Sequence, residues 1–126
     1  MSYEVKGQIL GFNTTHNVDI NEVDELFSTM IDSENENISF TLANPYILRE
    51  YSFDVPTNLK ILLDIKEDSR INVYNIVIIQ KPLEKSTVNF LAPIIVNEDS
   101  KKIGQAVLDH KTHPNFGIRE TIESFK

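Results

Sequence analysis

The chain has 126 residues, a formal net charge of -7, 40% hydrophobic residues and no cysteine. A chain of this length builds one domain whose core needs no covalent staple, and without cysteine it has no disulfide, thiolate metal site or cysteine nucleophile. The acidic balance argues against direct nucleic-acid binding, which needs a basic footprint.

No targeting or membrane segment is visible in the sequence. The opening MSYEVK lacks the basic and apolar segments of a secretory signal. The longest apolar runs, such as residues 76–79, are far too short to span a bilayer. We therefore expect one soluble, cytoplasmic domain that covers residues 1–126.

The first third of the chain predicts three strands. Residues 2–6 and 18–21 alternate apolar with polar side chains, which is the period of a strand with one buried face. Residues 26–31 carry apolar and small polar side chains on both faces and predict a third strand. The polar run over residues 32–37 is typical of a hairpin loop.

Acidic residues are concentrated in this same part of the chain. No lysine or arginine occurs between Gly7 and Leu48. That window holds seven acids, which are Asp19, Glu22, Asp24, Glu25, Asp32, Glu34 and Glu36. Such a stretch either solvates a surface or steers a basic partner protein toward it, and the sequence leaves both interpretations open.

Residues 38–56, ISFTLANPYILREYSFDVP, combine a strand with an unusually apolar turn. The strand ends at Asn44-Pro45, because proline has no amide donor and moves the residue before it out of the helical region. The aromatic and aliphatic residues that follow predict a buried corner rather than a solvated loop. Within the corner, Arg49-Glu50 favours a structural role, an arginine fork tied to carbonyls or acids, over a catalytic one.

The second half predicts one helix and three strands. Residues 57–65 place three leucines on one helical face, with Thr57 available to cap the start. Residues 71–80 are apolar on both faces and predict a central strand. Residues 88–97 predict a strand in which Pro93 requires an edge, a bulge or a bend between sheets. Residues 102–109 predict a last strand, paired with the preceding one as a hairpin.

These elements predict an all-β fold. About seven short strands and one short helix are typical of a small antiparallel β-barrel or sandwich. We expect the core to include the larger inward-facing side chains of the corner strand, the central strand and the proline-containing strand. These are Phe40, Leu42, Tyr74, Ile76, Ile78, Phe90 and Leu91.

No catalytic or metal-binding pattern stands out. His110 and His113 stand three apart beside Asp109, but no helix aligns them and no third ligand is specified. No serine has a base fixed beside it, and the four glycines are too scattered for a phosphate loop. We therefore expect no enzyme activity, no cofactor and no metal site.

Over nearly its whole length the chain resembles the flagellar assembly factor FliW family. The matching stretches are VKG and ILGF within residues 5–12, the corner over 38–56, VYNIVIIQKP at 73–82, STVNFLAPIIVN at 86–97, KIGQAVL at 102–108, and Ile118-Arg119. The NFLAPI stretch together with the NPY corner is specific to the family. The segment DHKTHPNFG at 109–117 is longer than the short turn that the family usually has there.

The resemblance implies a small, barrel-like cytoplasmic protein that is not an enzyme. It implies two protein partners, newly made flagellin and the carbon-storage regulator CsrA, a basic RNA-binding dimer that represses flagellin translation. On this basis we expect a flagellin chaperone and CsrA antagonist that acts as a monomer and exchanges one partner for the other. The alternative is a small β-barrel that binds a ligand or acts as a minor hydrolase.

Each partner has an expected surface. An acidic face suits the basic regulator, and its expected residues are Asp19, Glu22, Asp24 and Glu25. An apolar groove suits flagellin, whose terminal segments are helical and apolar in the filament, and its expected residues are Tyr46, Tyr51, Ile94 and Ile95.

Overall fold

The strand β5, Ile71–Ile78, is the element on which both layers of the protein pack. The computed structural model describes residues 1–10 and 14–125. The other strands are β1 Ser2–Val5, β2 Asn17–Glu22, β3 Phe27–Asp32, β4 Asn35–Ala43, β6 Thr87–Val88, β7 Ile94–Asn97, β8 Lys102–Gln105 and β9 Glu120–Thr121. The helices are α1 Pro45–Leu48 and α2 Thr57–Leu62, with 3-10 turns at Leu83–Lys85 and Ile122–Phe125.

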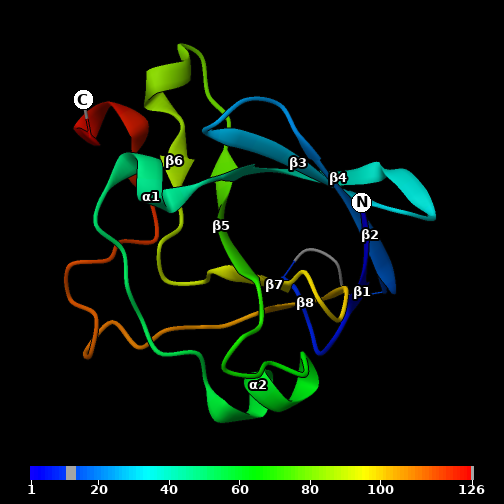
Figure 1. Ribbon diagram of the computed structural model, residues 1–126. Coiled ribbons are helices and arrows are strands. Elements are labelled where there is room, and N and C mark those ends of the chain that lie inside the picture. The colour runs from blue at the N-terminus through cyan, green and yellow to red at the C-terminus, as the bar shows by residue number, and fades with distance from the viewer. Residues whose placement is uncertain (11–13, 126) are drawn as a thin grey trace.

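Seven of these strands form a closed barrel. Pairing follows the order β4-β3-β2-β1-β8-β7-β5, and β4 also pairs with β5 and closes the ring (Figure 1). All neighbours are antiparallel except β1 and β8, which are parallel. The expected all-β barrel is confirmed. It differs from the expectation in this parallel pair and in having α1 as a second short helix.

The chain departs from the ladder of β5 at Pro93. β7 pairs Tyr74 with Ile94, and β6 pairs Val77 with Val88, along the same edge of β5. Three steps along β5 therefore correspond to six along its partner, and the extra residues bulge out between β6 and β7. Proline fits there because no ladder bond is required of it. The expected break at Pro93 is confirmed.

The corner begins with a helix start. Asn44 caps α1, since its side-chain oxygen accepts a hydrogen bond from Tyr46 N at 3.0 Å, and Pro45 occupies the first helical position. Asn44-Pro45 thus ends β4, as expected, and opens α1 at once. In α2 the expected cap by Thr57 is wrong. Pro56 is the cap residue, without a side-chain hydrogen bond, and Thr57 is already helical.

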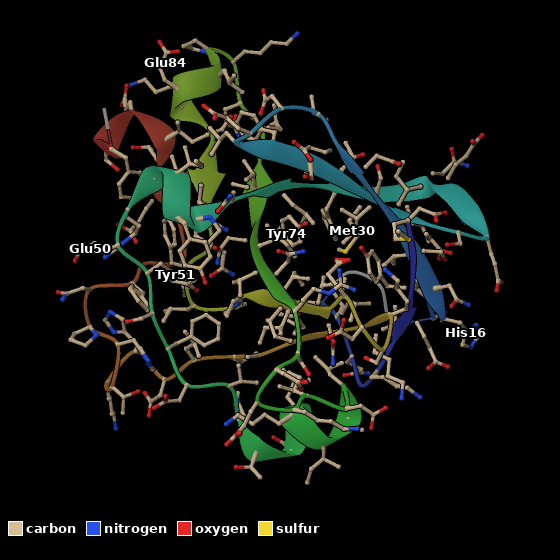
Figure 2. All side chains as sticks on the ribbon, viewed as in Figure 1. His16, Met30, Glu50, Tyr51, Tyr74 and Glu84 are labelled. Carbon is tan, nitrogen blue, oxygen red and sulfur yellow. The ribbon has the colours of Figure 1, made fainter. Side chains whose placement is uncertain are left out.

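Two apolar clusters lie on opposite sides of the barrel wall. Tyr74 and Ile76 face the inner cluster, whereas Val73 and Val77 face an outer cluster covered by the corner, α2 and the C-terminal segment. Figure 2 shows Met30 and Tyr74 inside the ring and Tyr51 outside it. The expectation that β5 is a central strand with both faces covered is confirmed.

The expected core residues divide by their position along the strands. Leu42, Phe90 and Leu91 are buried. Phe40, Tyr74 and Ile76 are half-buried and pack against the inner cluster. The prediction for Ile78 is wrong, because its side chain is 51% exposed where β5 ends.

Helix α2 packs directly on the backbone of β8. A Cβ atom at Gly104 would lie 2.7 Å from Leu59 Cδ1 and 3.3 Å from the carbonyl oxygen of Lys6. Glycine is therefore what lets α2 approach this closely. Within the described residues, no helix has the length and apolar character to cross a bilayer.

Candidate protein-binding surfaces

One mouth of the barrel opens into an apolar cleft of about 340 Å³. Phe40 and Ile76 reach it from the inner face of the wall, and Ile78 lies beyond them at the end of β5. The remaining lining comes from other strands and from the C-terminal segment. Those residues are Leu10, Thr87, Asn89, Gln105, Ile118 and Arg119.

A polar network lies at the other end of the barrel. The Tyr3 hydroxyl donates to both carboxylate oxygens of Glu98, at 2.7 and 2.9 Å, and Asn72 Nδ2 donates to the same carboxylate at 3.1 Å. Lys101 Nζ lies 3.6 Å from Glu98. Burial, and then the hydrogen bond to Glu98, raise the pKa of Tyr3, so its hydroxyl stays a donor. The two ends of the barrel therefore differ in chemistry, because one is polar and the other is apolar and open.

Of the four residues expected to bind flagellin, only Tyr46 presents its side chain to solvent, at 56% exposed. Ile94 and Ile95 are fully buried in β7, one in each cluster. Tyr51 is buried as well, and its hydroxyl donates to Phe90 O at 2.6 Å. These three side chains therefore cannot touch a partner in this fold. Ile94 and Ile95 are buried because β7 has an apolar cluster on each side, and Tyr51 is buried because its ring lies within the outer cluster.

Hydrogen bonds of Tyr51 join the corner to β5 and to the bulge before β7. Asn75 Nδ2 donates to the Tyr51 hydroxyl at 3.2 Å and to Asn89 O at 2.8 Å. Burial raises the pKa of Tyr51 to about 12. The Tyr51 ring also makes an edge contact with Tyr46, with the ring centroids 6.3 Å apart. The buried Tyr51 ring thus packs against the exposed Tyr46 ring and holds it in place.

Arg49 ties the corner to the C-terminal segment. Its Nη1 lies 3.1 Å from Glu120 Oε2 and donates to Asn115 O at 3.1 Å. Its guanidinium carbon lies 4.9 Å from the centre of the Phe116 ring. Glu50, beside it, is exposed and turns outward (Figure 2). The interpretation of Arg49 as a structural fork is confirmed.

The four residues expected to bind the regulator do not share one face. Asp19 lies near the start of β2 and lines an acidic hollow together with the β3–β4 hairpin, where Ser33 Oγ donates to its carboxylate at 3.1 Å. Glu22 and Glu25 lie at the opposite end of β2, in or beside the β2–β3 turn. Asp24 shapes that turn, because its Oδ1 accepts hydrogen bonds from the amides of Leu26 and Phe27 at 2.9 and 2.7 Å.

The seven acids thus form two groups at opposite ends of β2 and β3. Glu22, Asp24 and Glu25 make one group, and Asp19 joins the hairpin acids in the other. Within the described residues, none of the four expected regulator-binding acids forms an ion pair. These four residues therefore keep their charge available to a partner.

The histidines near the C-terminal end belong to a local turn. His113 Nδ1 lies 2.9 Å from Thr112 Oγ1, and the His113 ring stacks on Phe116. In the parts of the chain that the structure describes, no group of three or more His, Cys, Asp or Glu side chains is placed to hold a metal ion.

Sequence reasoning did not identify the exposed lining of the cleft. Leu10 and Ile118 are 59% and 61% exposed, and both line the cleft with Ile78. Alternation marks such residues as apolar but does not say where a barrel wall ends. The one available signal was Ile118-Arg119, which is part of the family resemblance.

Comparison with known proteins decides the family. The family model described as FliW protein matches residues 2–122. The chain belongs to the FliW family. It is 47% identical to flagellar assembly factor FliW 2 of Wolinella succinogenes over 99% of this chain and 92% of that protein. It is 42% identical to flagellar assembly factor FliW of Sulfurimonas denitrificans, over 99% of this chain and 98% of that protein.

A solved structure shows the same fold. The crystal structure of the flagellar assembly factor FliW matches with a TM-score of 0.85, covering 96% of this chain and 84% of that one. Its sequence identity to this chain is 20%, so the barrel is retained across a wide divergence of FliW-like sequences.

Proposed function

We propose that this chain is a cytoplasmic, non-enzymatic flagellar assembly factor that binds flagellin as a chaperone and antagonises a CsrA-type translational regulator. The observation that carries the proposal is an open apolar cleft in a chain 47% identical to a flagellar assembly factor. A cleft of this kind suits capture of an apolar segment of another protein. The acids of β2 and the β2–β3 turn, which form no ion pair with any other described residue, suit a basic partner.

The mechanism is partner exchange. When flagellin is abundant it occupies this protein, and the regulator stays free to repress flagellin translation. When flagellin is exported, the released protein captures the regulator and relieves the repression. Such a switch requires that binding of one partner weakens binding of the other, and thermodynamic linkage makes that weakening equal in both directions.

For flagellin, Tyr46 is the contact retained from the expected set. Its neighbour Ile47 is also exposed, so α1 presents two large apolar side chains side by side. Tyr51 contributes by holding Tyr46 through their ring contact, whereas Ile94 and Ile95 contribute only to the wall beneath. For the regulator, the docking residues are Asp19, Glu22, Asp24 and Glu25, now divided between two acidic groups.

Titration calorimetry with purified flagellin and purified CsrA tests the proposal. We expect this protein to bind each partner alone, and saturation with flagellin to weaken its affinity for CsrA by about 5-fold to 150-fold. An equal loss of flagellin affinity in the presence of CsrA is the internal control. If each partner binds with the same affinity whether or not the other is present, the switch is contradicted. If neither flagellin nor CsrA binds, the whole proposal is rejected.

Single substitutions test the flagellin contact. Tyr46→Ala should weaken flagellin binding, and Ile61→Ala on α2, which is also exposed, is the matched control. Unchanged flagellin affinity in a folded Tyr46→Ala variant removes α1 from the site.

The alternative, a small ligand-binding barrel or minor hydrolase, predicts a different outcome of affinity capture from a cell lysate. A co-purifying small molecule without flagellin or CsrA would favour it.

A further inference from the structure

Among the described residues that line the apolar cleft, a single side chain is charged, and its charge is positive. That residue is Arg119, and it lies in a chain whose net charge is -7. The other two arginines, Arg49 and Arg70, are ion-paired with Glu120 and Asp99. Among the described residues, Arg119 has no ion-pair partner. Its guanidinium therefore remains available to a partner's carboxylate.

The position of Arg119 is set by its neighbours. Gly117 N donates to Glu120 Oε2 at 2.7 Å, and Arg49 Nη1 holds the same oxygen at 3.1 Å. Phe90 N donates to Gly117 O at 2.9 Å, which fastens the start of this short loop to the bulge before β7. Ile118 and Arg119 are therefore presented at the rim by a loop that is fixed at both ends.

The rim places an apolar contact beside this charge. Ile118 precedes Arg119 in the chain, and Ile78 lines the cleft with both. Ile78 and Ile118 are 51% and 61% exposed, so a partner side chain that covers them removes apolar surface from water. An arginine fork at the edge of such a contact recognises a carboxylate with defined geometry, because its planar donors match two oxygens.

We propose that the cleft anchors a flagellin segment in which a large apolar side chain stands close to an aspartate or glutamate, with the apolar group against Ile78 and Ile118 and the carboxylate on Arg119. The inference rests on the proposed flagellin binding and names the chemistry of the segment that is bound. Charge complementarity selects the segment, because a lysine or arginine at the same position of the partner would be repelled by Arg119. The acidic groups of β2 remain for the basic regulator.

Binding of purified monomeric flagellin to variants of the full chain tests the anchor. Ile78→Ser and Arg119→Glu should each raise the dissociation constant by about 10-fold or more, as expected for central contacts of an interface. Arg119→Lys, which keeps the charge without the fork, should lose less. The matched controls are Ile61→Ser on α2 and Lys66→Glu before β5, both exposed, and they should change binding by less than about 2-fold.

Overlapping peptides that cover the flagellin sequence identify the segment. The peptides that bind should carry a large apolar residue within one helical turn of an acid. Replacing that acid by its amide should weaken binding to the wild-type chain but not to Arg119→Gln, because a double-mutant cycle isolates the contact between the two groups.

Three results overturn the inference. If the wild-type chain binds flagellin and the affinity is unchanged in both Ile78→Ser and Arg119→Glu, the anchor is rejected and the proposed function stands. Displacement of flagellin by millimolar octanoate, with no acid-bearing peptide bound, assigns the cleft to small apolar carboxylates instead. A wild-type chain that binds no flagellin rejects both proposals.

Discussion

Arg49 Nη1 lies 3.1 Å from Glu120 Oε2 and so joins the corner after β4 to β9 across a separation of 71 residues. The two side chains are only 19% and 27% exposed. The Arg49 guanidinium also lies over the rings of Phe90 and Phe116, at 5.1 and 4.9 Å from their centroids. One ion pair therefore closes the outer apolar layer and sets the loop that carries Arg119 at the cleft.

Glu120→Gln should destabilise the fold, because it leaves the partly buried guanidinium of Arg49 without its counter-charge. We expect a loss of about 1.5 to 3 kcal/mol in the free energy of unfolding, the range for hydrogen bonds to charged groups. Urea unfolding monitored by circular dichroism measures it. Glu123→Gln is the control, since its pair with Lys85 is exposed and should leave the midpoint nearly unchanged. Equal midpoints for the two variants would show that the Arg49 pair is dispensable.

Leu42 and Ile78 should respond very differently to truncation. Leu42 is fully buried in the inner cluster, so Leu42→Ala should cost about 2 to 5 kcal/mol in lost transfer energy and cavity formation. Ile78 is half-exposed at the mouth, and Ile78→Ala should cost less than about 1 kcal/mol. Chemical unfolding of both variants checks this. A large loss at Ile78 would mean that the mouth is part of the core and is closed in solution.

Stability should fall at alkaline pH through Tyr51. Burial raises its pKa to about 12, above the ordinary tyrosine value of about 10, so ionisation is easier in the unfolded chain. The stabilisation is fully present below pH 10 and is lost as the pH rises toward 12, by about 1.4 kcal/mol per pH unit in that window. Unfolding midpoints between pH 8 and 11 should therefore decrease, and less steeply in Tyr51→Phe. A slope that is the same in both chains would assign the effect to other groups, of which Tyr3 is the first to test.

The acids of the β2–β3 turn should raise the association rate with the regulator. Charge acts over about a Debye length, 8 to 10 Å at moderate salt, and steering raises association rates by about 10-fold to 1000-fold. We expect Glu22→Lys with Glu25→Lys to slow association of CsrA at low salt and to matter little at high salt. Asp24 is left in place because it caps the turn.

Stopped-flow kinetics with both partners provides the check. A matching pair, Glu34→Lys with Glu36→Lys, changes the net charge equally at the other end of β3 and reports whether the hairpin group, which includes Asp19, acts instead. Flagellin association should change little in either double variant. If the association rate of CsrA depends neither on salt nor on either pair of charge reversals, these acids only keep the protein soluble and do not steer the regulator.

Local patterns in the sequence determined the seven strands of the barrel, the corner and the break at Pro93, whereas the two-residue strand β9 was not predicted. Alternation is a property of each strand alone, so residues 71–80 could be identified as a strand covered on both faces before any partner was known. Asn44-Pro45 likewise marks the end of β4, because proline lacks an amide donor wherever it lies. The resemblance carried by NFLAPI and the NPY corner also reached the family without a structure.

Closure of the barrel decided what is exposed. Ile76 and Ile78 lie on the same face of β5 and look alike in the sequence. Ile78 nevertheless lies at the mouth and Ile76 inside the wall, because the strands on either side of β5 do not extend equally far along it. Ile94 and Ile95 are both buried because β7 has an apolar layer on each side. Asp19 and Glu22 are three residues apart, yet the antiparallel turns at the two ends of β2 and β3 place them in separate acidic groups. Whether an apolar or charged side chain meets water depends on which distant segments cover it, and that is set by how the ring closes rather than by any local sequence pattern.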